Sequence, residues 1–178
     1  MKKTFLLVTI MLWGALSTMN AQSFSGLQKS PTDISYAKKE RNSKPEIKVI
    51  YSRPQKKGRK IFGSLAAYDK VWRTGADEAT EIKFLQDVKM GDKSIKAGTY
   101  SLFTIPGEKE WTIIINSDLD SWGAYNYDKA KDIARIKAKV KSGDELEVFS
   151  IAFKQVDKGY HMVMGWDTTR VEVPFYLL

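Results

Sequence analysis

Short apolar runs that alternate with polar residues dominate the chain from Ile47 onward. In residues 47–52 (IKVIYS), the apolar Ile47, Val49 and Tyr51 share one face of an extended chain, and residues 81–90 (EIKFLQDVKM) repeat this alternation. A period of two is typical of β-strands, because successive side chains of a strand point to opposite faces of the sheet. The pattern therefore predicts strands in both segments.

Turn residues separate these runs at intervals of roughly ten residues. Four pairs favour tight turns: Gly91-Asp92, Pro106-Gly107, Gly143-Asp144 and Lys158-Gly159. Residues 110–116 (EWTIIIN) are apolar and β-branched enough for a central strand buried on both faces. Only residues 125–135 suit a helical turn. The sequence thus predicts an all-β fold, an antiparallel β-sandwich or partly open barrel of about 8–10 strands with at most one short helix.

Residues 133–177 predict three long strands, separated by the last two of these turns. In the first of them, charged and apolar residues alternate: Arg135, Lys137 and Lys139 against Ala134, Ile136, Ala138 and Val140. This spacing gives the strand one apolar and one solvated face. All predicted strands fit into a single β-sandwich domain, residues 46–178.

The first 45 residues do not follow the strand pattern. Residues 1–21 combine a positive start, MKK, with the apolar run TFLLVTIMLWGAL, which predicts a secretory signal peptide and is too short for a membrane span. We expect cleavage after Ala21; cleavage after Ser17 and an uncleaved N-terminal anchor are the alternatives. Residues 22–45 are rich in Ser, Lys, Asn and Pro, which predicts a flexible leader. The mature chain would then be exported, periplasmic or extracellular, without a transmembrane segment.

The chain has no cysteine and a single histidine, His161. This composition excludes disulfides, a lipid-anchoring cysteine and a zinc or copper site built from nitrogen and sulfur ligands of one chain. We therefore expect neither a metal nor a cofactor. His161 alternates with Met162 and Met164 in a predicted strand, and no GxSxG motif is present, so a surface or packing role is favoured over that of a catalytic base.

The formal net charge of the whole chain is +8 at pH 7. Removal of the signal, with its two lysines and no acid, leaves 27 basic against 21 acidic residues, a net charge of +6. An exported protein meets anionic glycans and envelope components rather than genomic nucleic acid, so the former are the expected partners. The basic loop 53–60 (RPQKKGRK) supplies the candidate anion-binding residues Arg53, Lys57 and Arg59, with a solvated loop as the alternative.

Four segments together resemble a known family: YSRPQKKGRKIFG, VWRTGADEATEIKF, AGTYSLFTIPGEKEWTIIIN and WGAYNYD. Their residues, order and spacing are similar to those of the exported bacterial proteins catalogued as domain of unknown function 2911. The resemblance covers most of the chain from about Ile47. It implies a single-domain, exported, β-rich protein, and it implies no activity.

Aromatic and charged residues gather in two of these segments. The candidate ligand-binding residues are Arg73, Asp77, Glu78, Glu81, Trp122, Tyr125 and Tyr127. The last three lie in a predicted loop, where flat rings beside polar groups suit a sugar-binding surface. Arg73 would fix an anionic or hydroxyl-bearing group, and Asp77 and Glu78 would complete a polar rim. Trp72 and Trp111 are instead predicted to cap the core.

Three functions remain open from the residues alone. A non-enzymatic binding or envelope-associated module for a glycan or another polar ligand is favoured. A glycan-acting hydrolase would use Glu78 and Glu81 as a pair of carboxyl groups beside an aromatic platform. A purely structural or assembly role is the third possibility. A structural interpretation also exists for Arg73 and Glu81, which are predicted to face one another as a clamp across a hairpin.

Overall fold

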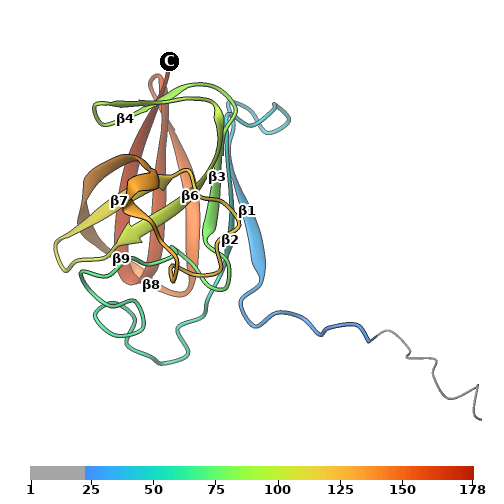
Figure 1. Cartoon of the computed structure of the whole chain (residues 1–178), viewed down its shortest axis with the longest axis vertical. Helices are drawn as coiled ribbons and strands as arrows, with labels where there is room; N and C mark the ends of the chain where they lie inside the picture. Colours follow the sequence, from blue (N-terminus) through green and yellow to red (C-terminus); the bar gives the residue numbers. More distant parts are fainter. Residues whose placement is uncertain (1–22) are drawn as a thin grey trace, which may run out of the picture.

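A computed structural model describes residues 23–178 and shows an all-β protein (Figure 1). Its strands are β1 (Thr32–Ala37), β2 (Ile47–Ser52), β3 (Thr80–Phe84), β4 (Val88–Met90), β5 (Lys93–Ile95), β6 (Gly98–Ile105), β7 (Glu110–Asn116), β8 (Asp132–Val156) and β9 (Gly159–Leu177). They form one antiparallel sheet that is not closed, in the order β1-β2-β3-β6-β7-β8-β9-β4-β5. The only helix of the described residues is a 3-10 turn, η1 (Lys129–Lys131). The predicted fold class is therefore confirmed.

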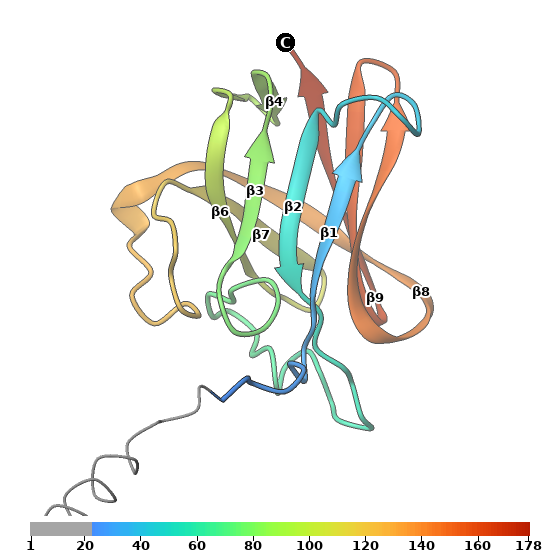
Figure 2. The same ribbon diagram turned by 90° about the vertical axis from the view of Figure 1, so that its right-hand side faces the viewer.

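The inner face of the sheet is apolar, as the alternation predicts. Ile47 and Val49 of β2 and Ile82 and Phe84 of β3 are buried, while the residues between them face outward. β7 lies between β6 and β8 and its isoleucines are fully buried, in agreement with the predicted central strand. The sheet folds over on itself, and the Phe84 ring packs on Phe175 of β9 with centroids 5.2 Å apart (Figure 2). The core lies between these two layers.

β8 and β9 replace the three long strands predicted for residues 133–177. Both are long, at 25 and 19 residues, and both change direction. The pairing of β8 shifts register between Ser142 and Ser150, and β9 turns at Asp167, where φ is 50°. The two ends of β9 then meet, since a Cβ on Gly159 would lie only 2.1 Å from the Phe175 carbonyl oxygen. Only glycine fits this close approach, and the bends let one hairpin fill one whole layer.

β1 lies inside residues 22–45, where the sequence predicts a flexible leader. It pairs with β2 from Thr32 opposite Ser52 to Ala37 opposite Ile47. Its Ile34 side chain is exposed, so backbone hydrogen bonds rather than core burial hold this strand. The structure thus differs from the expectation at residues 32–37. The predicted signal peptide, residues 1–21, lies outside the described residues, and no helix of the part described, 23–178, has the length and hydrophobicity of a membrane span.

Side chains hold the open seam between β2 and the second half of β8. The Tyr51 hydroxyl accepts a hydrogen bond from the Ile151 amide (2.9 Å) and donates to the Ile151 carbonyl (3.4 Å). Arg53 continues the seam, because its Nε donates to the Phe149 carbonyl (3.2 Å) and its guanidinium pairs with Asp33 (2.9 Å). These bonds replace the backbone ladder that a closed barrel would have at this position.

The seam gives a prediction for stability. Tyr51→Phe keeps the ring against Phe149 but leaves the buried Ile151 amide without an acceptor. We expect the free energy of unfolding to fall by about 1–3 kcal/mol. Urea denaturation followed by circular dichroism measures this loss.

Tyr36→Phe is the matched control, because Tyr36 is exposed on β1 and its hydroxyl makes no hydrogen bond to the described residues. Its effect should stay within about 0.5 kcal/mol. Equal effects of the two substitutions would contradict a role of the Tyr51 hydroxyl in the seam.

Candidate functional site

A cleft of about 500 Å³ lies at the end of the fold where β2 and β3 are connected. Its walls come from that connection, residues 53–79, from Ala124 and Tyr125 between β7 and β8, and from Trp166 of β9. The first of these is the teal and green loop below the strands in Figure 1. The topology therefore brings segments that are distant in the sequence to one site.

Arg73 is the most unusual residue of this cleft. Its Nε is buried and has no hydrogen-bond partner. The only other such side-chain atom among residues 23–178 is Nε1 of Trp111, which belongs to a fully packed ring of the core. A buried N–H group without an acceptor costs free energy. An acceptor from a ligand in the cleft would instead pair with the two terminal nitrogens of Arg73, which form no hydrogen bond with the described residues.

The charged residues that line the cleft are mostly basic. Arg59, Lys70 and Arg73 contribute three cations, against the single carboxylate of Asp77. Arg59 is held in place by hydrogen bonds from its guanidinium to the carbonyls of Gln55 (2.5 Å) and Lys56 (3.0 Å). An excess of positive charge in a concave site attracts anions.

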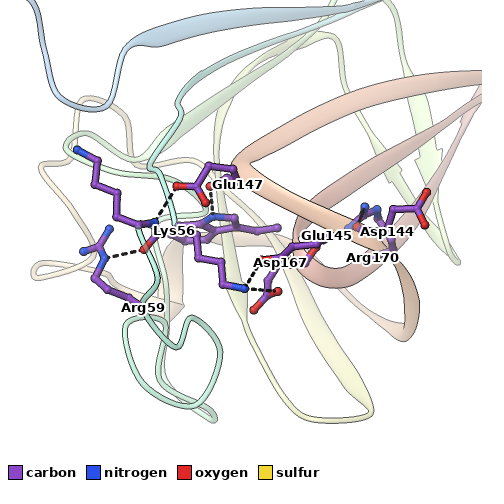
Figure 3. Close-up of polar contacts among 9 residues, drawn as sticks. Lys56, Arg59, Asp144, Glu145, Glu147, Asp167 and Arg170 are labelled. Carbon is purple, nitrogen blue, oxygen red and sulfur yellow. Dashed lines mark hydrogen bonds and ion pairs between the residues drawn. The ribbon is translucent and has the colours of Figure 1, made fainter.

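The basic wall is anchored to the bends of β8 and β9, as Figure 3 shows. Lys56 Nζ lies 2.8 Å from the Asp167 carboxylate and 2.6 Å from that of Glu145. These two hydrogen bonds, that of Asp167 first, raise the pKa of Lys56 and keep it charged. The Lys57 amide donates to the Glu147 carboxylate (2.8 Å). The wall of the cleft is thus fixed before any ligand binds.

Of the three candidate anion-binding residues, the structure places one in the cleft. Arg59 lines it. Arg53 makes the seam contacts described above, and Lys57 is exposed on the loop without lining the cleft. Basic composition alone does not distinguish these roles, because the direction of each side chain follows from the pairing of the loop with β8.

The loop that contains Trp122 and Tyr125 is joined to the Arg73 segment by backbone hydrogen bonds. The Gly123 amide donates to the Asp77 carbonyl (3.0 Å), and the Ala79 amide donates to the Ser121 carbonyl (2.9 Å). Gly123 has φ of +69°, and a Cβ there would lie 3.2 Å from a terminal nitrogen of Arg73. Glycine therefore lets this loop approach the guanidinium closely.

Tyr127 anchors the same loop and does not line the cleft. Its hydroxyl donates to the Asp132 carboxylate (2.8 Å) and accepts a hydrogen bond from Arg135, and its ring meets Phe103 edge-on at 5.2 Å. Burial, followed by the Asp132 hydrogen bond, raises the pKa of Tyr127 to about 12. The hydroxyl of this candidate residue is therefore already engaged inside the protein.

Glu78 and Glu81 line a different and smaller cavity of about 210 Å³, together with Asp120 and Ser101. Glu81 projects from the outer face of β3, since its neighbours Thr80 and Ile82 point into the core. No ion pair joins Glu81 to Arg73, so the predicted clamp across the hairpin does not form. The carboxyl pair is thus separated from the guanidinium and from Tyr125.

The floor of the cleft contains two stacked rings, of which Trp72 is predicted to cap the core. Trp72 and Trp166 both line the cleft and stack with centroids 6.1 Å apart and an interplanar angle of 18°. Trp111 packs behind Trp72 and is buried, as predicted for a core residue. Trp72 packs against the core, as predicted, and its ring also lines the cleft. The alternation of apolar and polar residues in a strand cannot predict that one ring both packs in the core and lines a cleft.

His161 lies on β9 and does not line the cleft. Its Nδ1 is 2.6 Å from the Glu172 carboxylate, which also pairs with Lys141 at 2.9 Å. The hydrogen bond with His161, followed by that with Lys141, lowers the pKa of Glu172 to about 2. The only histidine is therefore part of a charge network on the sheet.

Comparison with known proteins identifies one family. The family model described as "Protein of unknown function (DUF2911)" matches residues 30–175, which is most of the chain. No curated protein and no solved structure matches the chain.

The Glu172 network predicts a specific pH dependence of stability. The pKa of Glu172 is about 2 in the folded protein instead of 4.5, so the ionised carboxylate stabilises the fold above pH 4.5. This contribution disappears as the pH falls towards 2. We expect the difference in free energy of unfolding between wild type and Glu172→Gln to shrink between pH about 6 and about 2.5.

Urea denaturation at several pH values measures this difference. Glu108→Gln is the control, because Glu108 is exposed and forms no ion pair within the described residues; its difference from wild type should not change over that pH range. A Glu172→Gln difference that stays constant would disprove the assignment.

Proposed function

The chain belongs to the DUF2911 family, and from its own geometry we propose that it is a non-enzymatic binding module for a polar, anionic ligand such as a glycan. The ligand would occupy the 500 Å³ cleft with its anionic group at Arg73. One observation carries this proposal: Arg73 lines the cleft, and the two terminal nitrogens of its guanidinium form no hydrogen bond or ion pair with the described residues. A planar guanidinium suits carboxylate, sulfate and phosphate groups, which accept two parallel hydrogen bonds from it.

The rest of the cleft supports a ligand with both polar and apolar surface. Trp72 and Tyr125 supply ring surface, and Asp77 supplies an acceptor for hydroxyl groups. Its volume lies within the usual range of ligand sites, about 300–1,000 Å³. A few charged groups within an aromatic lining favour specific recognition of a sugar acid over general attraction of ions.

Two arguments favour binding over hydrolysis or a purely structural role. Hydrolysis of glycosides by the usual route needs two carboxyl groups beside the scissile bond. The cleft has one, Asp77, while Glu78 and Glu81 line the other cavity. A purely structural role would leave the cost of the unpaired Arg73 Nε uncompensated.

We also propose that the module is exported and acts in the periplasm or outside the cell. The support for this is the MKK start followed by an apolar run within residues 1–21. An anionic envelope component or glycan is then the expected partner. The excess of basic residues in the cleft agrees with such a partner.

Arg73→Gln tests the proposal. We expect the wild-type protein to bind acidic sugars, such as galacturonate or a sulfated sugar, more tightly than neutral galactose. Arg73→Gln should weaken the binding of acidic sugars by at least about tenfold, because a hydrogen bond to a charged group contributes about 1.5–3 kcal/mol. Arg73→Lys should fall between the two, since lysine keeps the charge without the planar fork. Isothermal titration calorimetry measures the affinities.

Lys139→Gln provides the control for a lost positive charge, because Lys139 is exposed on β8 and does not line the cleft. It should bind like wild type. Equal affinities of Arg73→Gln and wild type, or no binding of any acidic sugar, would refute the proposal.

A further inference from the structure

We infer that the ligand is an acidic polysaccharide that extends from the cleft across the loop of Trp122 and Tyr125. One oxyanion-bearing sugar would lie at Arg73, and neighbouring sugars would stack on the Tyr125 and Trp122 rings. This inference rests on the proposed binding function and specifies its ligand. It goes further by adding Trp122, which does not line the cleft, to the site.

The exposure of these two rings sets them apart. Trp122 is 62% exposed and Tyr125 is 79% exposed. The other tryptophans of the described residues, Trp72, Trp111 and Trp166, pack on one another in the core. Two exposed rings on one short loop offer flat surface on which the apolar faces of sugars can stack. Tyr125 follows Trp122 by three positions, so their Cα atoms are at most about 11 Å apart, and one chain-like ligand can reach both.

The exposed rings sit on a loop that is firmly held. Besides the bonds to the Arg73 segment, Lys131 pairs with Asp118 (2.5 Å), and the Ser101 hydroxyl donates to the Asp118 carbonyl (2.5 Å). The Tyr127 hydroxyl fixes the other end of the loop to Asp132. A platform that is ordered before binding loses little conformational entropy when a ligand stacks on it. The rings are thus presented as a preformed surface.

Positive charge is concentrated at the cleft end of the proposed site, whereas Glu78, which pairs with Trp122, and Asp120 line the neighbouring cavity. Arg59 and Lys70 line the cleft in addition to Arg73. Lys57 and Lys60 are exposed on the loop next to Arg59. One small anion would need a single cation, whereas a chain with an acid on successive sugars can contact several.

A flat anionic membrane surface fits less well. The Arg73 Nε is buried in a concave cleft, beneath the surface that a bilayer would touch. A sugar chain, in contrast, can place one of its residues inside the cleft and the next ones over the rim. The same oxyanion chemistry can come from carboxylated or sulfated chains, so both enter the test.

The experiment compares the dimer and the hexamer of galacturonic acid, with a sulfated hexamer and vesicles of anionic lipid as further arms. Calorimetry is carried out on wild type, Trp122→Ala and Arg73→Gln. We expect wild type to bind the hexamer about tenfold more tightly than the dimer. Trp122→Ala should remove most of this gain and bind the dimer like wild type, whereas Arg73→Gln should weaken the binding of both lengths.

The outcomes separate the inference from the proposed function. Equal wild-type affinities for dimer and hexamer, or an unchanged length dependence in Trp122→Ala, would overturn the polysaccharide inference and leave an Arg73-dependent small-ligand site. Vesicles that bind more tightly than both hexamers would overturn it in favour of a membrane surface. The carboxylated and sulfated hexamers decide which oxyanion is preferred. Lys83→Gln on the outer face of β3 is the control and should behave like wild type.

Discussion

The pairing of residues 54–56 with the bent part of β8 is the contact on which the rest of the structure depends. The Phe149 amide donates to the Pro54 carbonyl (3.0 Å), and the Lys56 amide donates to the Glu147 carbonyl (2.7 Å). β2 and β8 are not neighbours in the sheet, and this short pairing links the chain just after β2 to the second half of β8. It also fixes the start of the long β2–β3 connection. The wall of the cleft therefore begins at the point where the sheet is held together.

Arg170 and Lys56 make this pairing possible, because they satisfy polar groups at the two bends. Arg170 donates to the carbonyls of Asp144, Asp167 and Thr169, which the change of direction would otherwise leave unpaired. Lys56 bridges Glu145 and Asp167 (Figure 3). The cations at the bends thus stabilise the fold, whereas the cations that line the cleft form no ion pair with the described residues. Basic residues close together in the sequence divide between the two tasks according to which carbonyls and carboxylates they reach.

How much of this the sequence predicts depends on the range of the interaction concerned. The apolar and polar pattern of the sequence is enough to predict β2, β3 and the buried β7. A strand that buries one face has apolar residues at every second position. β1 has few apolar residues and is held by backbone pairing with β2, so its sequence lacks the pattern that would predict a strand. The bends of β8 and β9 depend on glycines and on Arg170, whose contacts lie far apart in the chain.

The candidate site shows the same limit. Arg73, Asp77 and Tyr125 are predicted from residue type and do meet in one cleft. Glu78 and Glu81 follow Arg73 closely in the sequence but line another cavity. Glu81 lies on the outer face of β3, where side chains alternate between the two faces, and Glu78 pairs with Trp122 before the strand begins. Tyr127 is separated from Tyr125 by one residue, yet its hydroxyl binds Asp132. Proximity in sequence therefore identifies the loops of the site, and only the tertiary contacts decide which side chain of each loop is available.

The cost of this arrangement is concentrated at Arg73. The Gly123 backbone lies close to a terminal nitrogen of Arg73, and Nε of the same guanidinium is buried without an acceptor. An unpaired buried N–H group costs about 1–3 kcal/mol, and the fold accepts the same cost at Nε1 of Trp111 in the core. Asp77 lines the same cleft as Arg73 but is not bonded to its Nε. The fold thus accepts a local loss of stability at a guanidinium that lines the cleft together with Trp72 and Tyr125.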